Sequence, residues 1–236
     1  MKIRVLLTAT VLGSLFVSTQ ALAGASANIG ATSNYLWRGI TQTQDGGAVQ
    51  AGLDYKADNG FYVGTWTSNA KFAGVAGTEL DLYAGYAKEL ESGLSYDVGV
   101  VNYGYHPKAV SREFAEAYGK VAYKGVGAEV DYTISKKSLT TDPVDYKKKD
   151  VYYGIGYNGK LANDWSYAIK TGKYNFDDPT GDDYGNTQLS LTKTVGKAGD
   201  FTLAVDKTSG QDAIALNDTK ANDAKVSLSW KKSFDF

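Results

Sequence analysis

The sequence predicts an all-β protein: a transmembrane, antiparallel, up-and-down β-barrel of about twelve strands that follows a cleaved signal peptide. Three observations lead to this fold class. The N-terminus has the composition of an export signal, apolar and polar residues alternate through the rest of the chain, and an alternating segment closes on the aromatic Phe236. Because side chains alternate across a strand, such segments have one apolar face and one polar face.

The export signal begins with a basic region at Lys2 and Arg4 and continues through a mostly apolar stretch at 5–17. That stretch is shorter than the ~20 residues that a membrane-spanning helix needs. Small residues follow it, so we expect cleavage after Ala23, with a second possible cut after Ala27. The chain then divides into a signal peptide at 1–23 and an outer-membrane barrel at 24–236.

Charge and composition exclude several classes of protein. Removing the signal removes two basic residues and no acidic one, so the net charge goes from −1 to about −3, and no basic stripe suggests a nucleic-acid partner. The chain has no cysteine and one histidine, His106, which excludes disulfides and a zinc site of the usual Cys/His kind. We expect no cofactor, no metal ligands and no catalytic residues.

Alternation is clearest near the C-terminus, where Val226, Leu228 and Trp230 lie on one face and Ser227 and Ser229 on the other. Comparable segments recur along the mature chain, which shows no helical periodicity. The expected strands are 26–39, 47–57, 61–72, 78–90, 94–106, 112–124, 126–137, 150–159, 165–176, 185–196, 201–209 and 224–236.

The connections between these strands alternate in length. Short ones are expected at 58–60, 91–93, around Gly125, 160–164 and 197–200, and longer ones at 40–46, 73–77, 107–111, 138–149, 177–184 and 210–223. The three prolines all fall in longer connections. Short periplasmic turns and longer extracellular loops are typical of outer-membrane barrels, so both termini are expected in the periplasm.

A soluble β-sandwich or lipocalin-like barrel also alternates, with its apolar face inward. The export signal, the abundance of tyrosine (18 residues) and the C-terminal aromatic favour the membrane barrel instead. The expected partners are therefore outer-membrane lipid and lipopolysaccharide. Phe236 is expected to act as the signal that the outer-membrane assembly machinery reads.

Several segments resemble one known family. They are Ser33–Thr43, Ala48–Tyr55, Gly60–Asn69, Glu79–Tyr86 and Gly93–Val100. Together they are similar to the TorF porin family, also catalogued as the uncharacterised Gcw_chp outer-membrane family, and the stretch from Arg38-Gly39 to Thr43 is the most specific part. Members of the family tend to close on Lys-Ser-Phe, which stands here at 232–234 with two residues after it. The resemblance implies a porin barrel and no particular substrate.

The polar faces of the strands supply the candidate lumen-lining residues. These are Arg38, Asp54, Glu79, Asp81, Asp97, Glu116, Lys120, Glu129, Asp131, Lys170, Asp206 and Lys231. Acidic residues outnumber basic ones, and rings of carboxylates in a pore favour cations, so a mild cation preference is one interpretation. The other is that the charges pair across the lumen and hold the barrel together, open or closed.

Arg38 has two interpretations. Its guanidinium could grip an anionic group of a solute, because its planar fork matches a carboxylate. Alternatively, it could have a structural role and pair with Asp54 or Asp81 beneath the first loop.

We expect a narrow passive channel for ions or small solutes, because a barrel of twelve strands has a backbone radius of only ~11–12 Å. A closed structural or adhesion barrel is the alternative. A lipid-modifying enzyme is the third possibility, but a nucleophilic serine needs a base within reach. His106 and the nearest serine, Ser111, form no compact motif, so the protein is not expected to be an enzyme.

Overall fold

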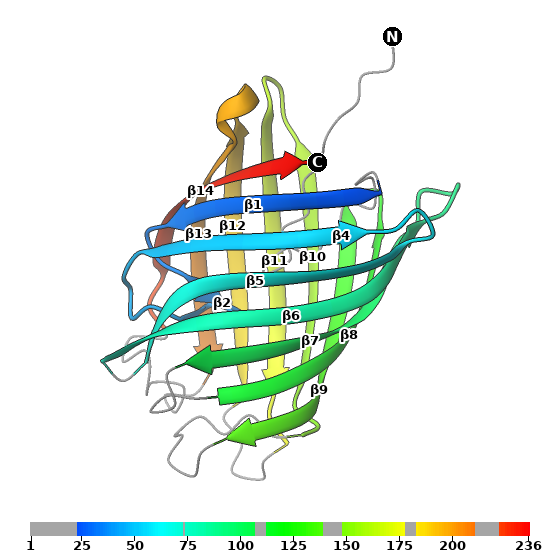
Figure 1. Cartoon of the computed structure of the whole chain (residues 1–236). Coiled ribbons are helices and arrows are strands. Elements are labelled where there is room, and N and C mark those ends of the chain that lie inside the picture. Colours follow the sequence, from blue (N-terminus) through cyan, green and yellow to red (C-terminus); the bar gives the residue numbers. More distant parts are fainter. Residues whose placement is uncertain (1–22, 73, 107–111, 139–147, 178–182, 211–221) are drawn as a thin grey trace.

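The computed structural model describes residues 23–72, 74–106, 112–138, 148–177, 183–210 and 222–236. It is a closed antiparallel barrel of twelve strands, as the sequence predicts (Figure 1). The wall strands are β1 (Gly24–Thr32), β4 (Ala48–Lys56), β5 (Phe61–Phe72), β6 (Val75–Glu89), β7 (Ser95–His106), β8 (Arg112–Tyr123), β9 (Val126–Ser138), β10 (Val151–Lys160), β11 (Trp165–Asn175), β12 (Tyr184–Thr194), β13 (Asp200–Gly210) and β14 (Lys225–Asp235).

Each wall strand pairs with its neighbours in sequence, and β1 closes the barrel by pairing with both β4 and β14. The register places Ser26 opposite Asp235 and Thr32 opposite Ser229. Figure 1 shows β1, in blue, between the red β14 and the cyan β4. Because the sheet closes on itself, no wall strand is left with an open edge.

The alternation along each strand separates an apolar outside from a polar inside. In β14, Lys225 and Ser227 are buried, whereas Val226 is 62% exposed and Leu228 59% exposed. The same holds in β6, where Glu79 and Asp81 are buried and Leu80 and Leu82 are exposed. A soluble barrel would have the opposite arrangement, with apolar side chains inward.

Aromatic side chains gather at the end of the wall where the short turns lie. The connections at this end are at 57–60, 90–94, 124–125, 161–164 and 195–199, the last of which contains the 3-10 turn η2 (Gly196–Ala198). Exposed aromatic residues beside these turns are Tyr55, Phe61, Tyr123, Trp165 and Phe201. Such a belt of aromatic rings is typical of the boundary between hydrocarbon and headgroups.

One predicted loop is much shorter than expected. The sequence predicts a connection at 73–77, but β5 ends at Phe72 and β6 already begins at Val75, opposite it. The prediction was wrong because Gly74, with φ of +82°, lets the chain reverse within two residues.

Residues 1–22 of the signal peptide predicted at 1–23, and all three prolines, lie outside the described residues, so the structure does not bear on their predicted roles. Within the described part of the chain, no helix is long and apolar enough to cross a membrane.

Candidate functional site

The chain leaves the barrel wall after Thr32 and returns to it at Ala48. Between them, residues 33–47 form what we call the inner hairpin, with two short paired strands, β2 (Leu36–Trp37) and β3 (Ile40–Thr41). Its turn consists of Arg38 and Gly39, whose φ angles are +49° and +83°. Two consecutive positive φ angles are characteristic of the two-residue type I′ hairpin turn, in which glycine is favoured.

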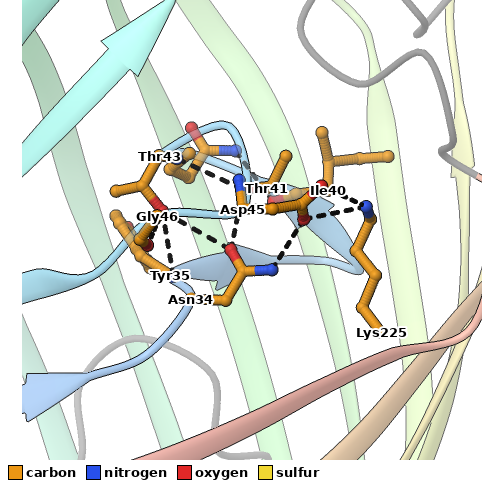
Figure 2. Close-up of polar contacts among 9 residues, drawn as sticks. Asn34, Tyr35, Ile40, Thr41, Thr43, Asp45, Gly46 and Lys225 are labelled. Carbon is orange, nitrogen blue, oxygen red and sulfur yellow. Dashed lines mark hydrogen bonds and ion pairs between the residues drawn. The ribbon is translucent and has the colours of Figure 1, made fainter.

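A network of hydrogen bonds holds the root of the inner hairpin (Figure 2). The Asn34 side chain donates to Asp45 Oδ1 at 2.8 Å and accepts from Thr41 Oγ1 at 2.7 Å. Thr41 Oγ1 also accepts from the backbone N–H of Asp45 at 2.9 Å. Lys225, on β14, donates to both oxygens of Asp45, at 2.8 and 3.0 Å. The root is thereby tied both to itself and to the wall.

At the tip, Arg38 forms a two-pronged ion pair with Glu116 on β8. Its two terminal nitrogens donate to the two Glu116 oxygens, each at 2.8 Å, and Nη2 also lies 3.3 Å from Asp131 Oδ2 on β9. The side chains of Arg38 and Glu116 are only 7% and 1% exposed. Burial lowers the pKa of Arg38, but the charges of Glu116 and Asp131 raise it more, so it ends well above its ordinary value.

A bulge between β8 and β9 sits beside this ion pair. Ala115 pairs with Ser135, whereas Glu116 pairs with Thr133, so Ile134 is an extra residue in β9. Glu116 and Thr133 are both buried, and Ile134 is exposed. Bulges commonly re-aim side chains near functional sites, and this one brings Glu116 and Asp131 to the same guanidinium.

Aromatic rings surround Arg38. Its guanidinium carbon lies 4.3 Å from the ring centre of Trp37, 4.2 Å from that of Tyr152 and 5.3 Å from that of Tyr174. The Trp37 ring in turn packs against Tyr103 at 5.8 Å between ring centres. A cation above aromatic faces is attracted by their quadrupoles, more strongly where water is excluded. The rings and the two carboxylates therefore fix Arg38 together.

The tip also touches the wall at β12 and β13. A Cβ atom at Gly39 would lie 2.6 Å from Thr208 Cγ2 and 3.0 Å from Asn186 Cβ. The inner hairpin thus starts at β1 and β4, crosses the interior, and reaches strands β7 to β13 on the other side. It lies within a bore whose backbone radius, for twelve strands, is only ~11–12 Å.

The structure corrects two predictions about this segment. The first strand was expected to run over 26–39, but β1 ends at Thr32. Arg38 was expected to pair with Asp54 or Asp81, and it pairs instead with Glu116 and Asp131. Both errors have one cause, which is that the chain turns inward after Thr32 instead of continuing up the wall.

The other eleven candidate residues all lie on wall strands, on the face opposite the exposed apolar side chains. Buried among them are Glu79, Asp81, Asp97, Glu116, Glu129, Asp131 and Asp206, whereas Asp54, Lys120, Lys170 and Lys231 are partly exposed. Part of this set is joined by ion pairs. Glu129 lies 2.7 Å from Lys170 Nζ and 3.8 Å from Lys120 Nζ.

Other carboxylates of the set bind hydroxyl or amide groups. Tyr83 donates to Asp54 Oδ1 at 2.5 Å, and Tyr62 donates to Asp97 Oδ1 at 2.7 Å. Gln188 donates to Asp206 Oδ1 at 2.9 Å. The sequence did not identify these tyrosines, nor the aromatic residues that surround Arg38. The one signal for the hairpin was the Arg38-Gly39 pair, because glycine after a polar residue favours a tight turn.

The remaining predicted positions are peripheral. Phe236 is 84% exposed, and its backbone N–H donates to the carbonyl of Ala25 at 3.0 Å. His106 is exposed at the end of β7, and Ser111 lies outside the described residues. Among the described residues, no cluster of three or more His, Cys, Asp or Glu side chains could hold a metal ion.

A family model described as a bacterial protein of unknown function (Gcw_chp) matches residues 19–234. The chain belongs to the Gcw_chp family. This confirms that part of the resemblance seen in the sequence, while the TorF porin assignment stays a prediction. No curated protein matches the Gcw_chp chain in sequence.

Solved structures of similar fold include a KdgM porin, which is 10% identical with a TM-score of 0.57 over 89% of this chain and 99% of that chain. A KdgM porin in complex with disordered oligogalacturonate is 9% identical, with a TM-score of 0.55 over 90% and 99%. A third, from work on in-meso crystallization of membrane proteins, is 10% identical, with a TM-score of 0.53 over 90% and 83%. At these identities the likeness establishes a shared barrel fold.

Proposed function

We propose that the protein is a narrow passive channel for ions or small solutes in the bacterial outer membrane, with the inner hairpin as its constriction. The observation that carries this proposal is a closed barrel with an apolar outside, a charged inside and a hairpin across the bore. The wall strands have 9 to 15 residues, and a tilted membrane-crossing strand needs about 9–11. Strands of this length with exposed aliphatic side chains are suited to lipid.

The similar fold of the KdgM porins supports a transport role and a location in the outer membrane. One of those structures is a complex with oligogalacturonate. We do not extend that ligand to this protein, because eight of its twelve candidate lining residues are acidic and would repel a polyanion. Small cations and small neutral solutes fit this lining better, so we propose a mild cation preference.

A closed structural or adhesion barrel is the second candidate. The observation that favours it is the burial of the hairpin tip, where the side chains of Arg38 and Glu116 are almost completely shielded from water. In that case the ion pairs of the interior would hold the wall rather than select solutes. The two functions differ in whether the barrel conducts at rest.

Single-channel recording of the refolded protein in a planar bilayer, with a salt gradient across it, separates these functions. We expect small, discrete conductance steps and a reversal potential on the cation-selective side. A reversal potential on the anion side would contradict the proposed selectivity. Heat-modifiable mobility on a gel shows that the barrel has folded. If such protein gives no current over many insertions, the channel is contradicted and the closed barrel is favoured.

A further inference from the structure

Strand β6 buries two carboxylates next to each other on the inward face. Glu79 and Asp81 are two residues apart, each is 0% exposed, and Leu80 between them points outward. Their cross-strand neighbours on β5 are Ser68 and Trp66. Two adjacent carboxylates removed from water are unfavourable unless a positive charge or a proton compensates them.

No basic side chain of the described residues forms an ion pair with either carboxylate. The guanidinium of Arg38 is engaged by Glu116 and Asp131 instead. Glu79 Oε1 accepts a hydrogen bond from the Tyr105 hydroxyl at 2.8 Å. Among the described residues, the other oxygen of Glu79 and both oxygens of Asp81 are buried without a well-formed hydrogen bond. Three carboxylate oxygens are therefore unsatisfied at one place in the wall.

A fourth buried oxygen comes from the inner hairpin. Tyr35 is 5% exposed, and its buried hydroxyl interacts with Glu79 but makes no well-formed hydrogen bond to any of the described residues. The charges of both Glu79 and Asp81 act on this hydroxyl, and the Tyr35 ring packs edge-on against Trp66, with 5.4 Å between ring centres. The Tyr35 backbone is fixed as well, because its carbonyl accepts from the N–H of Gln42 at 2.7 Å. The hairpin thus holds a neutral oxygen beside the two carboxylates.

We propose that Glu79, Asp81 and Tyr35 form a binding site for a small divalent cation of the calcium type. Hard cations take carboxylate and other oxygen ligands, and a double positive charge balances the two carboxylates. Two of the ligands belong to the wall and one to the inner hairpin, so the bound cation fastens the root of the hairpin to β6. The site differs in residues from the Arg38 cluster, and binding there does not depend on whether the barrel conducts.

Terbium luminescence tests this site, because Tb³⁺ substitutes for Ca²⁺ at oxygen sites and is sensitised by aromatic rings close by. Tyr35 and Trp66 are placed to excite it. The probe is TbCl₃ added to the folded protein in detergent micelles free of lipopolysaccharide, followed by competition with CaCl₂. We expect a saturable signal that calcium displaces. Absence of a saturable signal in the wild-type protein would overturn the proposal.

Variants test whether the terbium signal comes from the proposed site. Asp81→Asn and Glu79→Gln should each weaken binding by about tenfold or more, because affinity at such sites follows the charge of the ligands. Glu89→Gln is the matched control, since Glu89 lies on the same strand but is exposed. Tyr35→Phe keeps the ring, removes one oxygen and should also weaken binding, which provides a test if an acidic variant fails to fold. Equal binding by Glu79→Gln, Asp81→Asn and Glu89→Gln would refute the site.

Discussion

Arg38 and Glu116 are 78 residues apart in the sequence and meet across the bore, with the two terminal guanidinium nitrogens each 2.8 Å from one carboxylate oxygen. This geometry is the strongest form of the ion pair, because two parallel hydrogen bonds fix both distance and orientation. It places the tip of the inner hairpin against the wall opposite its root. The tip contact is therefore the point at which the proposed constriction can be opened.

We expect Arg38→Ala to increase the single-channel conductance. The substitution leaves Glu116 and Asp131 buried without their cation, so the tip should leave the wall, and the free energy of unfolding should fall by about 3–5 kcal/mol. Lys173→Ala is the control, because Lys173 and Asp183 form an exposed ion pair worth about 0–1 kcal/mol. Identical conductance in Arg38→Ala and wild type would show that the tip does not restrict the bore.

Gly39→Ala should also loosen the tip, for a steric reason. The new Cβ would lie 2.6 Å from Thr208 Cγ2, closer than side-chain atoms approach. Gly74→Ala is the matched control, because Gly74 has nearly the same φ, +82° against +83°, and no atom within 4 Å of the new Cβ. We expect both variants to lose stability through backbone strain, of about 1–3 kcal/mol. Only Gly39→Ala should raise the conductance. An equal change in conductance for both variants would show that the contact of Gly39 with Thr208 does not hold the tip in place.

Leu82→Arg tests whether the exposed apolar face lies in lipid. Leu82 is 56% exposed near the middle of β6, where an arginine facing hydrocarbon costs about 2–4 kcal/mol. Leu90, just beyond the end of β6, is the control, because the same substitution near the interface costs about 0–1 kcal/mol. Urea unfolding in lipid vesicles measures both. Similar losses at the two positions would argue against a bilayer around β6.

The mature N-terminus is expected at Gly24. Strand β1 begins there, and Gly24 to Ala27 are all paired with β4, at Lys56 to Leu53. A cut after Ala27 would remove these four residues from the strand that closes the barrel. The intact mass of protein purified from the outer membrane decides between the two cleavage sites.

Removing Phe236 should impair assembly more than stability. Its side chain is 84% exposed, so deletion loses little packing within the barrel. We expect less folded protein in the outer membrane but an almost unchanged unfolding midpoint for the protein refolded in detergent. Ser26→Ala is the control, because it makes a small change at a half-buried position of β1, the strand that pairs with the C-terminal strand β14. Normal outer-membrane levels of the truncated protein would rule out Phe236 as the assembly signal.

The sequence predicted the wall strands because each has its own alternation, which depends on neighbouring residues only. It failed at 33–39 because Tyr35 and Trp37 continue the outward-facing positions of Ile29 and Ala31, so the segment resembles a longer strand with aromatic residues at its end. What turns the segment inward is its contact with residues far along the chain. No local pattern shows which of eight inward carboxylates Arg38 will meet.

The candidate lining residues follow from the same pattern as the strands, since alternation assigns each polar side chain to one face. The sequence did not predict which of these residues lie together. Glu116 and Asp131 converge on Arg38 through a bulge at Ile134 that no periodicity reveals. Tyr35, the third residue of the proposed cation site, was expected in the wall as part of the strand predicted at 26–39 and lies instead in the inner hairpin.

The ion pair between Asp45 and Lys225 joins residues 180 positions apart, one near the beginning and one near the end of the barrel sequence. Lys225 begins the last strand and pairs with Asp206 on β13, so its bond to Asp45 can form only once the C-terminal segment has joined the wall. The root of the inner hairpin is therefore fastened to the wall only in a chain whose last strand is in place. A barrel that lacked β14 would leave the hairpin without this tie.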